Sequence, residues 1–345
     1  MDIVKNIAIY YFSGTGNAKQ IAFWFSELAK DRNIDCQCFD ITKLRRNTLP
    51  TIRPETLIII VSPVHGFNFP KITLDFIEHF PKGKNGIVLM STRAGMRIGR
   101  WATPGLTGIA FLLSSVILKS KGYKIMGQIP FDMPSNWISI HPALNEKTVE
   151  FLCKTNYRCV IQHADKLYSN KTDFLAYRDL IQDILISPVA LAYYLFGKFV
   201  LAKSFYATPE CNQCGLCEKE CPVKAIRNSN QQPFWTFKCE SCMKCMNSCP
   251  QQAIETTHGL WILLILLSSI VTSLICSLLI ACFQSMLVNV LLFSTVFLVL
   301  LWILYRIQHL LLKNRLLGRL IAFTSLTHYK FWGRYRLKQK KRFDE

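Results

Sequence analysis

The spacing of the cysteines constrains this 345-residue chain more than any other feature of its sequence. Eight of the 14 cysteines lie between Cys211 and Cys249, where the run Cys-x2-Cys-x2-Cys-x3-Cys-Pro occurs twice, beginning at Cys211 and again at Cys239. The likeness continues past each proline, because Ala225-Ile226 corresponds to Ala253-Ile254. Disulfide scaffolds are typical of short secreted domains, and the N-terminus lacks the pattern of a signal peptide. The sequence therefore predicts a duplicated unit whose reduced thiols bind metal in the cytoplasm.

The repeated run resembles that of bacterial ferredoxins with two [4Fe–4S] clusters, in which the fourth cysteine of each run binds the other cluster. The resemblance implies a first cluster on Cys211, Cys214, Cys217 and Cys249, and a second on Cys239, Cys242, Cys245 and Cys221. A pair of structural zinc sites is the alternative, although zinc would leave the third and fourth cysteines of each run without a role. The other six cysteines lack such spacing and are expected to be small buried hydrophobes: Cys36, Cys38, Cys153, Cys159, Cys276 and Cys282.

Residues 1–170 alternate between short apolar runs and helical patterns. We expect strands at residues 5–12, 33–40, 57–62, 86–91 and 123–129. Helices are expected after the turn at residues 13–17, from Pro70 to about Phe80, and at residues 106–120 and 146–169. This alternation predicts an α/β fold with a doubly wound parallel sheet, covered by helices on both faces. In such sheets ligands bind at the carboxyl ends of the strands.

A glycine turn follows the first expected strand at once. It reads Ser13-Gly14-Thr15-Gly16-Asn17 and precedes an expected helix, so its hydroxyls, its N–H groups and the helix dipole suit a phosphate. A Walker loop would need Gly-Lys-Ser/Thr, which is absent. A dinucleotide-binding fingerprint would need a third glycine at the position of Lys19. Asp40, an acidic residue near the end of the second expected strand, gives this alternative only weak support. A structural turn without a ligand is the remaining alternative.

The tract from Tyr11 to Ala18, the Ser62–Gly66 loop and the later cysteine runs together resemble the family of flavodoxin-like–ferredoxin fusion proteins. The resemblance covers roughly residues 5–257 and implies FMN, held by loops after the first, third and fourth strands. It places the FMN contacts at Ser13, Gly14, Thr15, Gly16, Asn17, Pro63, Val64, His65, Gly66, Phe67, Ser91, Thr92, Arg93, Ala94 and Gly95. The candidates for stacking on the flavin are His65, Phe67, Phe69 and Trp101, each of which is as readily a packing residue.

Two features depart from flavodoxins, which are typically acidic. The first 170 residues carry 21 Lys and Arg against 12 Asp and Glu, a formal charge of +9. The third expected loop, residues 91–101, also contains Arg93, Arg97 and Arg100. Positive charge near a flavin would favour its anionic reduced form and raise its potential, so a low-potential carrier role is not implied.

The C-terminal third is apolar and then basic. Residues 260–305 contain no Asp, Glu, Lys or Arg, and Leu260–Phe283 and Met286–Tyr305 are long enough to cross a bilayer about 30 Å thick. We expect a two-helix hairpin that turns at Gln284-Ser285, with a buried soluble hairpin as the alternative. Residues 306–345 carry a formal charge of +9, which predicts a cytoplasmic tail on anionic lipid. Residues 307–326 read as an interfacial helix; a nucleic-acid-binding tail is the alternative.

These patterns predict five segments. They are a flavodoxin-like domain at 1–170, a helical connector at 171–204 that Pro188 interrupts and that lies along the membrane surface, a small α+β ferredoxin domain at 205–257, a hairpin of two membrane helices at 260–305 and a basic tail at 306–345. We expect a multi-pass protein of the cell membrane with its redox parts on the cytoplasmic side. We expect no nucleic-acid partner.

The expected function is electron relay between FMN and two clusters, with a redox protein or a quinone as partner. One alternative is a flavin enzyme that reduces a small substrate and takes electrons from the clusters, with the arginines of residues 91–101 gripping an acidic substrate. A weaker one is a redox sensor that signals through the tail. No constellation for acid, base or nucleophilic catalysis is evident, so whether the chain turns over a substrate is left open.

Overall fold

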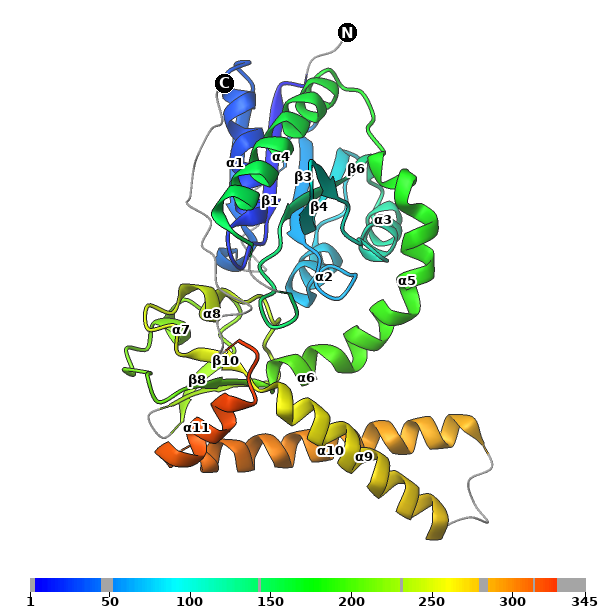
Figure 1. Cartoon of the computed structure of the whole chain (residues 1–345). Helices are drawn as coiled ribbons and strands as arrows, with labels where there is room; N and C mark the ends of the chain where they lie inside the picture. The colour runs from blue at the N-terminus through cyan, green and yellow to red at the C-terminus, as the bar shows by residue number, and fades with distance from the viewer. Residues whose placement is uncertain are drawn as a thin grey trace. The chain divides into compact units, whose positions relative to one another are not determined.

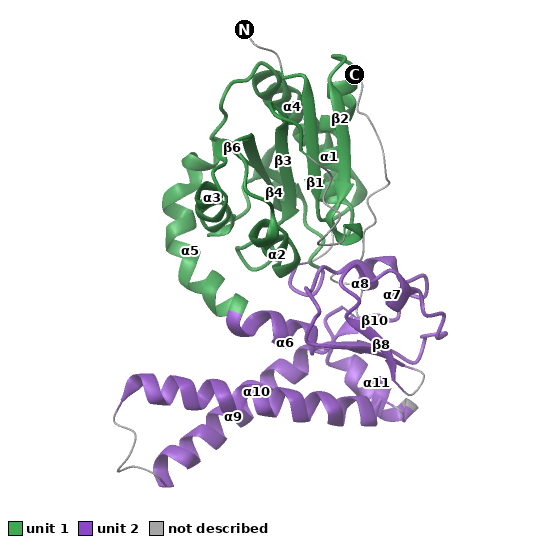
Figure 2. Ribbon diagram, turned by 180° about the vertical axis from the view of Figure 1, so that it is seen from behind, with its two compact units in different colours: residues 1–137, 143–194, 334–345 green, residues 138–142, 195–333 purple. Residues whose placement is uncertain are grey.

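The computed structural model describes residues 4–44, 52–141, 144–229, 232–278, 285–312 and 314–327. The described residues form two compact units, which are coloured separately in Figure 2. Unit 1 comprises residues 4–137 and 144–194, and unit 2 comprises residues 138–141 and 195–327.

Unit 1 is built on a parallel sheet (Figure 1). Five strands run in the spatial order β2-β1-β3-β4-β6, and all four pairings along this order are parallel. Counted along the chain this is the flavodoxin-like order 2-1-3-4-5, which confirms the predicted fold class. The strands are β1 (Asn6–Tyr11), β2 (Asp35–Asp40), β3 (Leu57–Pro63), β4 (Gly86–Ile98) and β6 (Lys124–Pro134).

Helices cover both faces of this sheet. On one face α1 (Asn17–Lys30) packs against α4 (Glu146–Tyr168), and α2 (Lys71–His79) packs against α3 (Ala110–Ser120) on the other. The side chains of Ile58, Ile59 and Ile60 in β3 are fully buried. A strand covered on both faces needs apolar residues at every position rather than at alternate ones, which explains the continuous apolar run at 57–62.

The fourth strand is longer than the sequence predicts. We expected it to end at Ser91, but β4 continues to Ile98 and then turns back into β5 (Trp101–Thr103), which pairs with it antiparallel. Strand β6 provides the partner for this extension as far as Gly95, which lies opposite Pro134. Gly95 permits the close pairing, because a Cβ there would lie 2.2 Å from the carbonyl oxygen of Asp132.

A continuous helical run leaves unit 1 at Tyr194. It begins with the 3₁₀ turn η2 (Leu175–Asp179) and continues through α5 (Leu180–Ala192), the π turn η3 (Tyr193–Gly197) and α6 (Lys198–Ala202). The expected break at Pro188 is wrong, since α5 contains this proline. A proline removes one helix hydrogen bond without ending the helix, and the π turn that follows is a typical irregularity of such a helix.

Unit 2 repeats one small motif. The short helices α7 (Leu216–Lys219) and α8 (Lys244–Ser248) begin at the same place in each cysteine run. Two antiparallel pairs complete the motif: β7 (Phe205–Ala207) with β10 (Ile254–Thr256), and β8 (Ile226–Ser229) with β9 (Gln232–Trp235). The equivalent residues Ala225 and Ala253 are both buried.

Among the described residues, three long helices are apolar enough to cross a membrane. They are α9 (His258–Leu278), α10 (Met286–Leu311) and the run Leu175–Ala202, judged by length and composition. Helices α9 and α10 pack against each other and form the predicted hairpin, whose expected turn residue Gln284 lies outside the described residues. The run Leu175–Ala202 adds a third candidate to the two expected spans. A last helix, α11 (Arg315–Phe323), has Leu316, Leu320 and Phe323 exposed.

Candidate redox site

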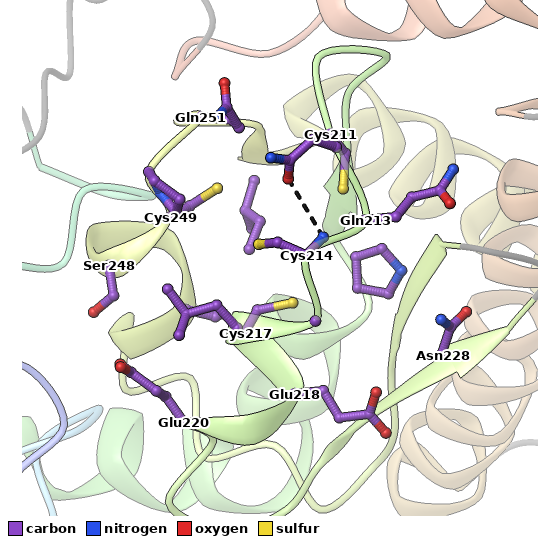
Figure 3. A pocket seen from close by; sticks show the side chains of 17 residues that line it. Cys211, Gln213, Cys214, Cys217, Glu218, Glu220, Asn228, Ser248, Cys249 and Gln251 are labelled. Atoms are coloured by element: carbon purple, nitrogen blue, oxygen red, sulfur yellow. Dashed lines mark hydrogen bonds between the residues drawn. The ribbon is translucent and has the colours of Figure 1, made fainter.

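Five cysteines line one pocket of unit 2. Cys211, Cys214, Cys217 and Cys249, with Cys245, contribute to its wall, and Figure 3 shows the first four sulfur atoms turned toward its interior. Cys211 interacts electrostatically with Cys214 and Cys249, and Cys217 with Cys211 and Cys249. The carboxylates of Glu218 and Glu220 also line this pocket. The structure thus brings together the four residues predicted as ligands of the first cluster.

A second group of four forms around Cys239. This cysteine interacts with Cys242 and Cys221, and Cys245 interacts with all three of them. These are the residues predicted as ligands of the second cluster. Cys245 of this second group also lines the pocket around the first group, so the two groups are neighbours in unit 2.

Backbone N–H groups already point at several of these sulfur atoms. The N–H of Ala225 donates to Cys221 Sγ at 3.2 Å, and that of Ala253 donates to Cys249 Sγ at 3.4 Å. These two hydrogen bonds occupy equivalent places in the two cysteine runs, which explains why the same Ala-Ile pair follows each proline. The N–H of Ser241 also donates to Cys239 Sγ, at 3.4 Å. Such hydrogen bonds stabilise thiolate ligands and raise the reduction potential of a cluster.

Burial makes the free thiols reluctant to ionise. It raises the pKa of Cys217 to about 11 and that of Cys242 to about 12, and it raises the pKa of Cys239 as well. Binding of a metal requires thiolates, so assembly here releases protons. Among the described residues, no three His, Cys, Asp or Glu side chains converge on a point for one metal ion. A four-iron cluster fits cysteines that are further apart, because each thiolate binds a different iron atom of the cluster.

A buried lysine lies beside the second cysteine group. Lys203 is 2% exposed, and its ammonium donates to the carbonyl of Trp235 and faces three aromatic rings. The ring centroids of Phe234, Phe237 and Tyr305 lie 4.6, 4.4 and 4.4 Å from Nζ. Burial lowers the pKa of Lys203 to about 8, while the nearby Cys239 acts in the opposite direction. Lys203 follows a long apolar helix, and nothing in the sequence around it indicated that it would be buried beside the cysteines.

The first expected FMN loop lies at the carboxyl end of β1, beside the point where the strand order reverses. Gly16 has a φ of 115°, which favours glycine, and it immediately precedes α1. Ser13 Oγ accepts a hydrogen bond from the Gly16 N–H at 3.1 Å, and Asn17 Nδ2 donates to the Pro134 carbonyl at 2.8 Å. Ser13 and Asn17 therefore shape the loop. The loop supplies hydroxyls, N–H groups and a helix N-terminus, which suit a phosphate.

The second expected loop, after β3, carries an aromatic cluster. His65 and Asn68 close a tight turn through reciprocal backbone hydrogen bonds of 2.8 and 3.3 Å. Trp137 stacks on His65 with ring centroids 6.0 Å apart, and Tyr193 packs on Trp137 at 5.7 Å. Gly66 lies against this cluster, since a Cβ there would lie 2.0 Å from Tyr193 Cδ1. Neither Trp137 nor Tyr193 was predicted as a site residue, because single aromatic residues in irregular segments show no periodic pattern.

The third expected loop is instead part of β4. Ser91, Thr92 and Arg93 are buried in this strand. Arg93 Nε donates to Asp132 at 2.6 Å and Nη1 donates to Asp179 at 2.6 Å, with 1% of the arginine side chain exposed. The guanidinium is therefore neutralised by carboxylates rather than free for a flavin or an acidic substrate. Trp101 is 79% exposed in β5.

One family model matches the cysteine segment. Residues 210–254 match the 4Fe-4S dicluster domain, which supports iron–sulfur binding in unit 2. No curated protein sequence matches the chain.

Several solved structures are similar to a part of this chain. Flavodoxin of Megasphaera elsdenii is 16% identical over 44% of this chain and 98% of its own, with a TM-score of 0.28. Flavodoxin 1 of Bacillus cereus is 13% identical over 46% and 98%, with a TM-score of 0.31. Rubredoxin oxygen:oxidoreductase of Desulfovibrio gigas is 11% identical over 47% of this chain and only 37% of its own, with a TM-score of 0.27. At these scores the likenesses carry no argument, and the fold assignment rests on the strand order.

Proposed function

We propose that this chain is a membrane-anchored electron-transfer protein that relays electrons between FMN on unit 1 and two [4Fe–4S] clusters on unit 2. The observation that carries the proposal is the grouping of the eight cysteines into the two sets that the ferredoxin pattern requires. FMN exchanges one or two electrons and a four-iron cluster exchanges one. The dicluster match and the flavodoxin-like strand order support electron transfer in general.

The chain's own residues have distinct parts in this proposal. Eight thiolates hold the clusters, and the N–H groups of Ala225, Ser241 and Ala253 stabilise the charge on three of them. The loop after β1 binds the single phosphate of FMN, with Thr15 as its free hydroxyl. The Trp137–His65 stack lies at the neighbouring loop, where it would exclude water from a bound flavin.

Metal analysis tests the cluster half of the proposal. Protein purified without oxygen should contain about eight irons and eight sulfides. Cys214→Ala and Cys242→Ala should each lose about half of the iron, because each removes a ligand of a different cluster. Cys38→Ala is the matched control, since this exposed cysteine on β2 belongs to neither set and should leave the iron content unchanged. Bound zinc without broad visible absorption would contradict the proposal.

Flavin affinity tests the other half. FMN should bind in preference to FAD, because the loop after β1 suits one terminal phosphate. Thr15→Ala should weaken FMN binding by about ten- to a hundredfold, since a hydrogen bond to a charged group contributes roughly 1.5–3 kcal/mol. Thr42→Ala, on the short turn after β2, is the control. Equal FMN affinity in wild type and Thr15→Ala would reduce residues 13–17 to a structural turn.

Membrane attachment through α9 and α10 is part of the same proposal, with anionic lipid at the basic C-terminal residues. The two helices make an even number of crossings and return the chain to the side of the cysteine-rich segment, residues 205–257, which the basic tail marks as cytoplasmic. The run Leu175–Ala202 adds no crossing, because Asp179 and Asp183 tie its first turns to unit 1. A quinone or a redox protein is the proposed partner.

A further inference from the structure

The cation of Lys203 has no carboxylate partner among the described residues. Its recorded interactions are the Trp235 carbonyl, three aromatic rings, Cys239 and the cation of Arg306. We call Lys203 with the rings of Phe234, Phe237 and Tyr305 the lysine cage. A buried ammonium is energetically costly unless an opposite charge compensates it. None of the described residues of the lysine cage supplies that charge.

The missing counter-charge lies in the direction of Cys239. Phe237, whose ring centroid lies 4.4 Å from the ammonium, stands two residues before Cys239, and the Cys239 N–H donates to the Thr236 carbonyl at 3.2 Å. Cys239 belongs to the second cysteine group, together with Cys221, Cys242 and Cys245. A four-iron cluster held by four thiolates is a net anion, and reduction adds one more negative charge without breaking a bond. Among the described residues, the pocket of the first group is lined by Glu218 and Glu220 and by no lysine or arginine, while Lys244 pairs with Glu220 at 3.1 Å.

We propose that Lys203 is the built-in counter-ion of the second cluster and raises the reduction potential of that cluster. This inference rests on the proposed function. The positive charge favours the more negative, reduced cluster, and the aromatic rings keep water from screening it. The Trp235 carbonyl holds the ammonium in place. The carboxylate of Glu240, which interacts with Cys239 and Cys242, acts in the opposite direction, and the buried ammonium of Lys203 offsets it.

Redox titration of the full-length protein, followed by electron paramagnetic resonance, tests this inference. In Lys203→Gln, which loses the charge and keeps a donor for the Trp235 carbonyl, one of the two midpoints should fall. We expect at least a tenfold change in that one-electron equilibrium, which is about 59 mV, and an unchanged midpoint for the other cluster. In a Cys214→Ala background, which removes a ligand of the first cluster, the remaining signal should be the one that shifts.

Three further variants separate the causes. Lys203→Arg keeps the charge and should leave the midpoint near its wild-type value, while Lys203→Met should shift it as Lys203→Gln does. Lys198→Met removes a less buried lysine of the same helix and should move neither midpoint. If the neutral variants lose iron while Lys203→Arg retains it, the charge is still required and the inference stands.

Other outcomes would overturn the inference. A Lys203→Gln protein with full iron content and both midpoints unchanged would refute the counter-ion role alone. Loss of iron in Lys203→Arg as well as in the neutral variants would show that Lys203 acts through its shape. Wild-type protein without iron and sulfide would instead overturn the proposed function, so the two failures can be told apart.

Discussion

The guanidinium of Arg93 connects two parts of unit 1 that are far apart in the sequence. It lies between Asp132 in β6 and Asp179 at the end of η2, and its Nη1 also donates to Thr107 Oγ1 at 3.3 Å. Asp132 accepts a further hydrogen bond from the Gly105 N–H at 2.7 Å. A buried ion pair of this kind specifies an arrangement more than it stabilises one, because the charges must first be desolvated.

Replacing Arg93 should release the helical run from unit 1. In Arg93→Leu the buried carboxylates of Asp132 and Asp179 lose their counter-charge, which costs about 3–5 kcal/mol. We expect faster hydrogen exchange and protease cleavage between η2 and α5. Arg97→Leu is the control: Arg97 contacts the Phe151 ring and the Gly99 carbonyl at an exposed position, and its loss should cost less than about 1 kcal/mol. Equal protection in both variants would contradict this role of Arg93.

Asp183 makes a second attachment that depends on pH. Its carboxylate accepts from the N–H groups of Thr107 at 3.2 Å and Gly108 at 2.7 Å, while burial raises its pKa. A carboxyl whose pKa is raised on folding weakens the folded state as pH rises through that pKa. Asp183→Asn keeps an acceptor without the charge, so its docking should be at least as stable as wild type at pH 7, and any advantage should disappear in acid.

Asp183→Leu is the matched variant for this prediction. It leaves two backbone N–H groups without an acceptor, which costs about 1–3 kcal/mol for each group. Hydrogen exchange at residues 105–112 should therefore increase in Asp183→Leu but not in Asp183→Asn. Similar exchange in the two variants would show that these hydrogen bonds do not hold α5.

At the scale of elements, the turn between β3 and α2 depends on one glycine. Gly66 has a φ of 55°, and a Cβ there would overlap Tyr193, whereas Gly99 has a φ of 59° and open space around it. Gly99→Ala should cost only the backbone strain, about 1 kcal/mol. Gly66→Ala should cost several times more and weaken FMN binding, because the turn must move or Tyr193 must leave Trp137. Isothermal calorimetry with FMN would measure the difference, and equal affinities would contradict it.

Many of these elements could be predicted from the sequence. The apolar runs predicted β1 and β3 within one residue, and the cysteine spacing predicted two groups of thiols that the structure brings together. The continuation of β4 to Ile98 could not be predicted, because Arg93 reads as a solvent-exposed residue until Asp132 and Asp179 are known to surround it. Lys203 and Trp137 were missed for a similar reason: their roles depend on neighbours from distant segments.

At the scale of the whole molecule, two kinds of membrane contact respond differently to salt. Buried apolar surface on α9 and α10 is not screened by ions, whereas attraction of the basic C-terminal residues to anionic lipid is. The full chain should therefore remain in the membrane fraction after a wash in high salt. Protease added to intact cells should not cleave the C-terminal residues, whereas protease added to inside-out vesicles should. Release by salt, or cleavage from outside, would contradict the proposed attachment.

The packing of unit 2 sets an order of events during synthesis. The Trp235 N–H donates to the hydroxyl of Tyr305, 70 residues later, and the Thr256 N–H donates to Thr327 Oγ1, 71 residues later. The ribosome therefore releases all eight cluster cysteines before it has made the residues that close the lysine cage. Final packing of the cysteine-rich segment must therefore wait until α10 and the residues up to Thr327 have emerged, late in the synthesis of the chain.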